Sequence, residues 1–257
     1  MICVICSTSS LETLTNHRYE LFRFCFTLNH LPFIVNKFVP MILTHSIEVD
    51  KREVRAVYDR GNDFYAWFLG PPMLYTSGVF ESEDDSLQQA QDNKMTIACN
   101  KIHLQENETV LDIGCGWGSF ACFAAEKYGA RVTGVTISKE GHAFSVGQAE
   151  EKKVTDKVNF LLNDYREIPL NKYDKITCFE MAEHVGVKNF QIFLSIVSER
   201  LKDDGIFYLQ IAGLRRHWQY EDLIWGLFMN KYIFPGADAS CPLNWYVGQL
   251  ETVSLPS

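Results

Sequence analysis

The feature that most constrains the fold is an alternation of short apolar runs with helix-like stretches, which starts at Val110 and continues to Ile211. This order is typical of strand–helix–strand units, which build a parallel sheet. We therefore predict an α/β fold with a doubly wound parallel sheet, whose ligand lies beyond the carboxyl ends of the strands. The predicted strands are residues 110–113, 131–136, 158–162, 175–179 and 205–211, and the predicted helices are residues 119–128, 140–152 and 189–201.

Charge and cysteine content exclude several function classes. The 257 residues include 24 Lys and Arg against 32 Asp and Glu, a net charge of -8. A nucleic-acid-binding surface needs a basic stripe, so we expect no nucleic-acid partner. The eight cysteines are not evenly spaced, and Cys3 and Cys6 form a C-x-x-C without a second ligand pair at matching spacing. We expect reduced intracellular thiols, no disulfide and no metal site.

The chain divides into three parts by composition. Residues 1–45 are rich in Leu, Phe, Ile and Val, but charged residues and two prolines interrupt them too often for a membrane-spanning helix. Two interpretations stay open: a helical lid on the main domain, or an amphipathic segment at a membrane surface with Arg23 and Lys37 at its polar edge. We expect residues 46–105 to form a helical lid and residues 106–257 to bind the ligand.

A glycine-rich turn follows the first predicted strand. The segment from Asp112 to Gly118 reads D-I-G-C-G-W-G, and its glycines let the backbone turn tightly and approach a ligand. A dinucleotide-binding turn would read G-x-G-x-x-G and place its acid about 20 residues later, whereas Asp112 precedes the glycines. A negative charge beside the turn favours a cationic ligand. The alternative is a tight strand-to-helix turn without a ligand.

This segment resembles motif I of the class I S-adenosylmethionine-dependent methyltransferases. The resemblance implies S-adenosylmethionine as cofactor, with the glycine turn against its methionine part, a ribose contact at the end of the second strand, and an adenine contact after the third. The cofactor-binding residues that it implies are Asp112, Gly114, Gly116, Gly118, Thr136, Asp164 and Tyr165. Asp164 has a plain structural alternative, because Asp often caps a turn.

Further segments resemble the cyclopropane fatty acid synthase family, whose members methylate the double bond of a lipid acyl chain. These segments are residues 58–65 (YDRGNDFY), 74–78 (LYTSG) and 179–186 (FEMAEHVG). Longer runs, at residues 173–186, 209–213 and 218–240, are similar to the sphingolipid carbon-9 methyltransferases. The resemblance covers about residues 45–250. It implies transfer of a methyl group to an unsaturated lipid, namely carbon nine of the sphingoid base of ceramide or glucosylceramide.

Methylation of an alkene sets demands on the site. The positive charge that develops on the lipid must be kept from water and stabilised, for which aromatic faces are suited. Candidate aromatic residues are Phe64, Tyr65, Trp67, Trp218 and Trp225, although packing in the core or lid is the plainer interpretation for most of them.

The methylated lipid must then lose a proton, which requires a base. The resemblance implies that Glu183 helps to hold a bicarbonate base, and that Glu183 acts either directly or through this anion. His184 and Tyr58 complete the implied catalytic set, and Tyr75 and Thr76 are implied cofactor contacts. The structural alternative for Glu183 and His184 is a capping and charge pair at a helix start.

The sequence departs from the cyclopropane synthases at three positions. Ser77 replaces a cysteine, Leu209 and Gln210 fall near an expected histidine, and Gly141 replaces a cofactor-facing glutamine. The first two changes favour a methyl-branched product over ring closure, because they alter the bicarbonate pocket. A cyclopropane fatty acyl phospholipid synthase remains the alternative enzyme, and an inactive lipid-binding module is the alternative from another class.

The end of the sequence also differs from the family pattern. Class I methyltransferases finish with antiparallel strands, whereas this sequence ends at Ser257 soon after a helix-like stretch at residues 245–253. We expect the final antiparallel strands to be missing and the 257 residues alone to have weak or no activity. We also expect an intracellular protein at a membrane surface, such as the cytosolic face of the endoplasmic reticulum. The sequence gives no indication of the oligomeric state.

Overall fold

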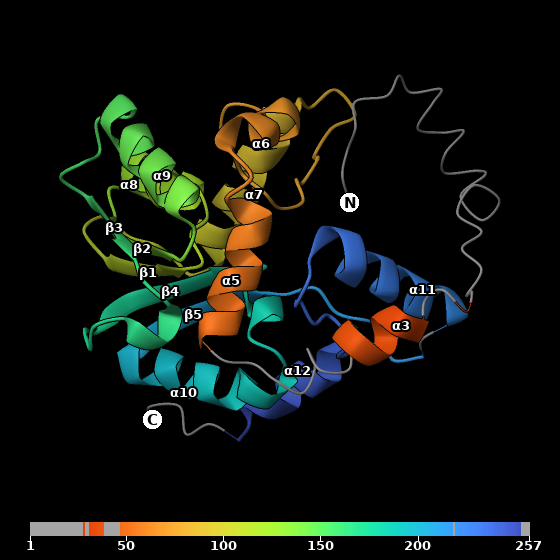
Figure 1. Ribbon diagram of the computed structural model, residues 1–257. Coiled ribbons are helices and arrows are strands. Elements are labelled where there is room, and N and C mark those ends of the chain that lie inside the picture. Colours follow the sequence, from red (N-terminus) through yellow and green to blue (C-terminus); the bar gives the residue numbers. More distant parts are fainter. Residues whose placement is uncertain (1–27, 29–30, 39–46, 218, 253–257) are drawn as a thin grey trace.

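The computed structural model describes residue 28 and residues 31–38, 47–217 and 219–252. Its centre is a sheet of five parallel strands in the order β3-β2-β1-β4-β5, which confirms the predicted doubly wound α/β fold (Figure 1). The strands are β1 (Thr109–Ile113), β2 (Arg131–Thr136), β3 (Val158–Leu162), β4 (Tyr173–Phe179) and β5 (Leu201–Gln210). Within the described ranges the sheet contains parallel strands alone.

The fifth strand starts earlier than its sequence indicates. Asp203, Asp204 and Gly205 suggest a turn before the strand, but β5 already pairs with β4 at Leu201. The register then shifts, so that the acidic segment forms a bulge in the ladder. The turn residues are therefore absorbed into the strand.

Helices cover both faces of the sheet, because the strand side chains alternate between two hydrophobic clusters. Val110 packs with α7 and α8 on one face, and Leu111 packs with α10 and α12 on the other. The longer helices are α5 (Ile47–Tyr58), α6 (Asn62–Leu69), α7 (Leu87–Lys101), α8 (Ser119–Tyr128), α9 (Lys139–Glu151), α10 (Phe190–Arg200), α11 (Tyr220–Phe228) and α12 (Leu243–Leu250). The short elements are α3 (Leu31–Phe33), η2 (Ile34–Phe38), η3 (Tyr165–Glu167), η4 (Ala182–His184), η5 (Val187–Asn189) and η6 (Met229–Ile233).

The segment predicted as a lid, residues 46–105, contains α5, α6 and α7. Val54 and Tyr58 of α5 line a pocket together with the glycine turn after β1. Helix α7 packs instead against α8 and belongs to the layer that covers the sheet.

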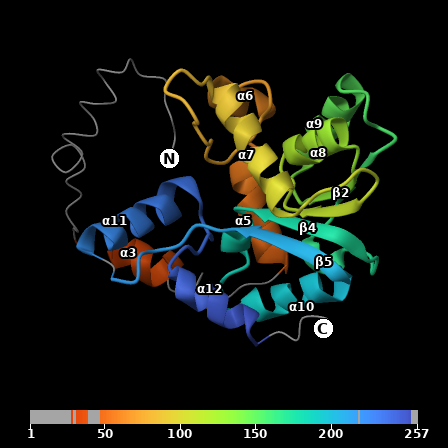
Figure 2. The ribbon, with the colours of Figure 1, turned by 180° about the vertical axis from the view of Figure 1, so that it is seen from behind.

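A second group of helices lies away from the sheet. Figures 1 and 2, which view the molecule from opposite sides, both show α11 beside α3 at this position. Most of the segment 1–45, including Arg23, lies outside the described residues, so the choice between lid and membrane-surface segment stays a prediction there. None of the described helices is both long enough and apolar enough to cross a bilayer.

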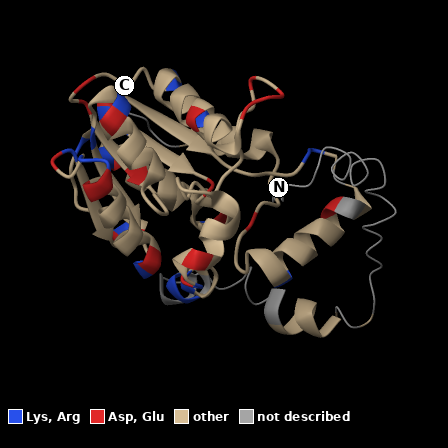
Figure 3. Cartoon of the chain, turned by 90° about the horizontal axis from the view of Figure 1, so that it is seen from above, with Lys and Arg blue, Asp and Glu red and all other residues tan. Residues whose placement is uncertain are grey.

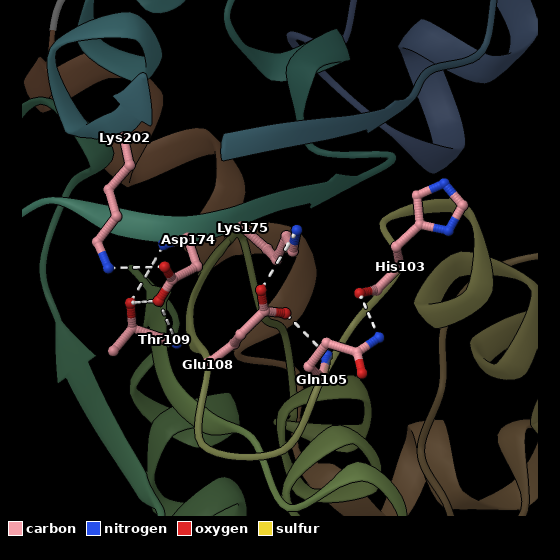
Figure 4. Close-up of polar contacts among 7 residues, drawn as sticks. All are labelled: His103, Gln105, Glu108, Thr109, Asp174, Lys175 and Lys202. Carbon is pink, nitrogen blue, oxygen red and sulfur yellow. Dashed lines mark hydrogen bonds and ion pairs between the residues drawn. The ribbon is translucent and has the colours of Figure 1, made fainter. Parts of the chain in front are cut away.

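Polar side chains join the strands at the amino-terminal edge of the sheet (Figure 4). The backbone N–H and the hydroxyl of Thr109 both donate to the carboxylate of Asp174, at 2.9 and 2.7 Å, and the ammonium of Lys202 lies 2.6 Å from the same group. Beside them, Lys175 pairs with Glu108 at 3.5 Å. This edge therefore links β1, β4 and β5 through partnered charges.

Candidate active site

The glycine turn after β1 forms the floor of a pocket. Gly114, Gly116 and Gly118 all have positive φ, between 55° and 80°, a conformation that side chains with a Cβ adopt at a cost. A Cβ at Gly114 would collide with the side chain of Met181, whereas a Cβ at Gly116 would meet no atom within 4 Å. Gly116 thus keeps open a space that another residue would fill, and this space faces the pocket.

Gly118 has a different role from its two neighbours. It is the N-cap of α8, and a Cβ there would lie 2.6 Å from Ser145 and 2.8 Å from Phe160. It is not among the residues that line the pocket. Its lack of a side chain allows close packing of α8 against α9 and β3.

Asp112 places a carboxyl group on the wall of the pocket. It is 1% exposed and accepts a hydrogen bond of 2.9 Å from the hydroxyl of Thr177. Burial raises its pKa to about 7, which the hydrogen bond from Thr177 offsets only in part. No Lys, Arg or His among the described residues pairs with it, so a cationic ligand would supply the missing counter-charge.

The ends of β2 and β3 contribute the predicted Thr136, Asp164 and Tyr165, all of which line the pocket. The Asp164 carboxylate accepts hydrogen bonds of 2.7 to 2.9 Å from the backbone and the guanidinium of Arg166 and caps η3. The capping role that sequence analysis gave as an alternative is therefore present. The Tyr165 ring packs edge-on against Phe193 in the core, at 5.5 Å between centroids.

An aromatic cluster, which includes Trp117 of the glycine turn, contributes to the wall of the pocket. The ring centroid of Tyr58 of α5 lies 6.1 to 6.3 Å from those of Tyr65, Tyr75 and Trp117. Its hydroxyl lies 3.3 Å from Nε2 of His184. Burial, with smaller contributions from the nearby tyrosines and from Glu183 and Glu180, raises the pKa of Tyr58 far above its ordinary value, so the phenol keeps its proton.

The other predicted aromatic residues are more exposed. Phe64 and Trp67 of α6 are 39% and 81% exposed, and Trp225 of α11 is 43% exposed. Trp218 lies outside the described residues. The aromatic residues that line the pocket are Tyr58, Tyr75, Trp117, Phe120, Tyr165 and Phe179, and Tyr65 packs against Trp117.

Glu183 lies behind the pocket wall. It is 6% exposed, and Oε1 accepts a hydrogen bond of 2.5 Å from the backbone N–H of Ala212. Its other oxygen, Oε2, is buried without a hydrogen-bond partner. Burial raises the pKa of Glu183 to about 7, despite the Ala212 N–H. The next residue, His184, lines the pocket and contacts Tyr58, so the two residues face different surroundings.

A polar network that the sequence analysis missed joins two walls of the pocket. Lys94 of α7 donates to the hydroxyls of Thr76 and Ser77. Gln210, at the end of β5, donates to Thr76 at 3.3 Å and to the carboxylate of Glu180 at 2.7 Å. Lys94, Thr76 and Glu180 line the pocket. The available signal for this network was a lysine on the face of α7 that also carries Ala90, Met95 and Ala98.

The contact at Gly141 explains one departure from the family pattern. A Cβ at this position would lie 2.6 Å from the carbonyl oxygen of Gly116. A glutamine here would therefore push against the glycine turn. Gly141 allows the start of α9 to lie close to that turn, and Ser138 caps the helix at the same point by accepting from the Gly141 N–H at 2.9 Å.

Comparisons with known proteins show which family this chain is similar to. Residues 45–242 match the family described as mycolic acid cyclopropane synthetase. The chain is 51% identical over 246 residues to a sphingolipid C9-methyltransferase of Komagataella phaffii and 46% identical over 245 residues to that of Candida albicans. The matches cover 91% and 92% of this chain and 50% and 48% of those relatives. The chain thus spans about half the length of these relatives.

More distant relatives and solved structures extend the comparison. The cyclopropane-fatty-acyl-phospholipid synthase of Escherichia coli is 39% identical over 178 residues, which cover 69% of this chain and 44% of that protein. The cyclopropane synthase MmaA2 from Mycobacterium tuberculosis superposes with a TM-score of 0.73 at 29% identity, covering 78% and 73% of the two chains. A mycolic acid cyclopropane synthase, CmaA1, in complex with SAH and CTAB gives 0.70 at 28% identity, covering 78% and 72%. The chain belongs to the mycolic acid cyclopropane synthetase family.

Proposed function

We propose that this chain carries the donor-binding core of a lipid methyltransferase that uses S-adenosylmethionine to methylate carbon nine of the sphingoid base of ceramide or glucosylceramide. The observation that carries the proposal is Asp112, a buried carboxyl group that faces a glycine-lined pocket without a cationic partner among the described residues. The identity of about 50% to sphingolipid C9-methyltransferases supports the substrate class.

The residues present fit this donor. Gly116 leaves open the space that a ligand needs to approach the backbone, and Asp112 supplies a negative charge for the donor's ammonium or sulfonium. Thr136 and Asp164 stand at the ends of β2 and β3, where hydroxyl and carboxylate groups suit a nucleoside. When bound, the donor supplies an electrophilic methyl group. The protein must hold the lipid alkene against that group and keep water away.

The aromatic cluster is suited to excluding water and to stabilising the positive charge that develops on the lipid. The rings of Tyr58, Tyr75 and Trp117 form an apolar wall, and their faces stabilise a nearby positive charge by roughly 0.5–2 kcal/mol each. Tyr58 stays protonated and neutral, which keeps its ring suited to this role.

Removal of the proton is assigned to Glu183 and His184. Three groups near the expected bicarbonate position are already engaged within the protein: Ser77 with Lys94, Gln210 with Glu180, and the Ala212 N–H with Glu183. This arrangement supports direct action of the protein's own residues over a bound bicarbonate. The imidazole of His184 lines the pocket and would accept the proton first, and the buried, unpartnered Oε2 of Glu183 behind the pocket wall is the group that would take it from there.

The test uses the full chain with S-adenosylmethionine and an unsaturated glucosylceramide. A product that gains one methyl group and keeps a substituted double bond, read from mass and proton spectra, supports the proposal. Loss of the olefinic signals on addition of the same mass would indicate a cyclopropane synthase. Binding of S-adenosylhomocysteine without any product would agree with the weak or absent activity expected of the 257 residues alone, and binding of the lipid as well would indicate a lipid-binding module.

A membrane surface is the second part of the proposal. Apolar residues are exposed on the α3–α11 side of the molecule, among them Leu31, Val35, Leu223, Trp225 and Tyr232. Figure 3 shows few charged residues along these helices compared with the sheet-bearing part. A patch of this kind suits insertion into a lipid surface, from which the substrate would enter. Replacing Leu223 and Trp225 with serine should lower the fraction of protein that co-sediments with liposomes. An unchanged bound fraction would contradict the proposed membrane contact.

A further inference from the structure

Lys94 is a buried cation that the methyl-transfer argument leaves unused. It is 4% exposed, and its ammonium contacts the hydroxyls of Thr76 and Ser77. Among the described residues, no carboxylate lies within ion-pair distance of it, in contrast to Lys175, which is also buried and pairs with Glu108. Glu180 attracts this ammonium from beyond ion-pair distance, but burial without a direct counter-charge is costly, so the site suits an anion.

The donors around Lys94 are arranged to receive such an anion. An ammonium has three N–H donors, and Thr76 and Ser77 accept two of them. The Thr76 oxygen accepts from both Lys94 and Gln210, so both of its acceptor positions are used and its own O–H remains to donate. Lys94 and Thr76 both line the pocket, which therefore offers a positive charge and a hydroxyl donor side by side.

The surroundings keep this site in place. Gln91, one turn before Lys94 on α7, donates to the carbonyls of Leu69 and Leu74 and so ties the helix to the segment that carries Thr76. Glu180 holds the amide of Gln210 at 2.7 Å and does so from a φ of +49°, a conformation that a residue other than glycine keeps only where its surroundings impose it. Thr76 is thus oriented from two sides.

The charged groups that line the pocket include a cation, Lys94, and a carboxyl group, Asp112, besides Glu180 and the paired Asp164 and Arg166. An α-amino acid group carries one carboxylate and one ammonium and would match Lys94 and Asp112. We propose that Lys94, with the hydroxyl of Thr76, binds the carboxylate of the amino-acid end of the methyl donor. This inference rests on the proposed use of S-adenosylmethionine. It adds a recognition residue to the donor site and commits to the donor's carboxylate over free bicarbonate.

The experiment compares two ligands on the full chain by calorimetry. One is S-adenosylhomocysteine, and the other is its decarboxylated analogue, which lacks the carboxylate alone. We expect Lys94→Met to weaken binding of S-adenosylhomocysteine by about 10- to 100-fold, the range for a hydrogen bond to a charged group, and to leave binding of the analogue within twofold. Equal losses for both ligands would overturn the assignment.

Controls separate this contact from effects on folding. Lys101→Met, at the exposed end of the same helix, should change neither affinity. Thr76→Val keeps the shape of the side chain but removes the hydroxyl, and it should weaken binding of S-adenosylhomocysteine selectively. If Lys94→Met does not fold, Thr76→Val alone decides, and equal effects on both ligands contradict the proposal. The proposal is also contradicted if Lys94→Met changes the effect of added bicarbonate on binding but leaves the ratio of the two ligand affinities as in wild type.

Failure of the underlying function has a different signature. If wild-type protein binds neither ligand, the proposed use of S-adenosylmethionine is wrong. If wild type binds S-adenosylhomocysteine and its analogue equally well, and Lys94→Met changes neither affinity, the donor site stands and the role of Lys94 alone fails.

Discussion

Carboxyl side chains lie at both the amino-terminal and the carboxyl-terminal edge of the sheet, but they have different roles at the two edges. At the amino-terminal edge, partial burial disfavours ionisation of Asp174, but hydrogen bonds from Lys202 and Thr109 outweigh it and lower the pKa to about 2. At the carboxyl edge, burial dominates and raises the pKa of Asp112 and of Glu183 to about 7. Partnered carboxylates hold the strands together, whereas under-partnered ones remain available for a ligand.

These pKa values give the two edges opposite effects on stability as pH changes. Asp174 has a lower pKa in the folded chain than the ordinary 3.8, so its stabilisation is present above pH 3.8 and is lost as pH falls toward 2. Asp112 has a higher pKa in the folded chain, so its stabilisation is present below pH 3.8 and is lost as pH rises through about 7. At neutral pH the carboxyl edge therefore carries a cost in stability.

The largest effect on donor binding is expected at Asp112. Asp112→Asn keeps an acceptor for Thr177 but removes the charge, so binding of S-adenosylhomocysteine should fall by at least about 100-fold. The same change should raise stability at pH 8 by on the order of 1–3 kcal/mol, because the buried charge is gone. Calorimetry and thermal unfolding measure the two outcomes. A variant that binds S-adenosylhomocysteine normally, or that is less stable than wild type at pH 8, would contradict the different roles assigned to the two edges.

Glu183→Gln should act on chemistry and spare binding. Product formation should fall by about 10²–10⁴-fold, the usual contribution of a positioned base, with affinity for S-adenosylhomocysteine unchanged. In wild type, turnover should rise with pH through about 7, because the base must be ionised. Product yield by mass spectrometry across pH is the measurement. Full activity of the variant would remove Glu183 from the mechanism.

Asp174→Ala tests the other edge. It removes the shared acceptor of Thr109 and Lys202 and should lower the free energy of unfolding by about 1–3 kcal/mol at pH 7, with less difference from wild type near pH 2. Donor affinity should stay within twofold, since the site lies at the opposite edge. Denaturant titration at both pH values checks this, and a loss of donor binding in the folded variant would contradict it.

The smallest effect is expected for Glu108→Gln, also at the amino-terminal edge. It weakens the 3.5 Å pair with Lys175 but keeps an acceptor for the Gln105 N–H. The expected loss is about 0.5–1 kcal/mol, because Glu108 is partly exposed and the amide oxygen of glutamine still offers an acceptor to the buried Lys175. Unfolding by urea would measure it. A larger loss of unfolding free energy than in Asp174→Ala would show that the Glu108–Lys175 pair contributes more to stability than the contacts of Asp174.

Much of the fold could be predicted from periodicity, because parallel strands buried on both faces leave a strong apolar signal. The predicted start of the fifth strand was wrong, because Asp203, Asp204 and Gly205 locally indicate a turn. In the fold, pairing of Leu201 with β4 includes these residues in β5. The glycine turn and its acid were identified because their spacing is local. Lys94 and Glu180 were not identified, because their roles depend on hydrogen bonds with Thr76 and Gln210, which are distant from them in the sequence.

Binding of S-adenosylhomocysteine to the full chain, followed by calorimetry at pH 7.5, tests the central claim most directly. We predict one site per chain, lost in Gly116→Val, whose side chain would fill the open space at the turn, and kept in Gly147→Ala, a helical glycine that also has open space around it. An absence of binding in wild type, or equal binding by Gly116→Val, would contradict the assignment of this pocket to the methyl donor.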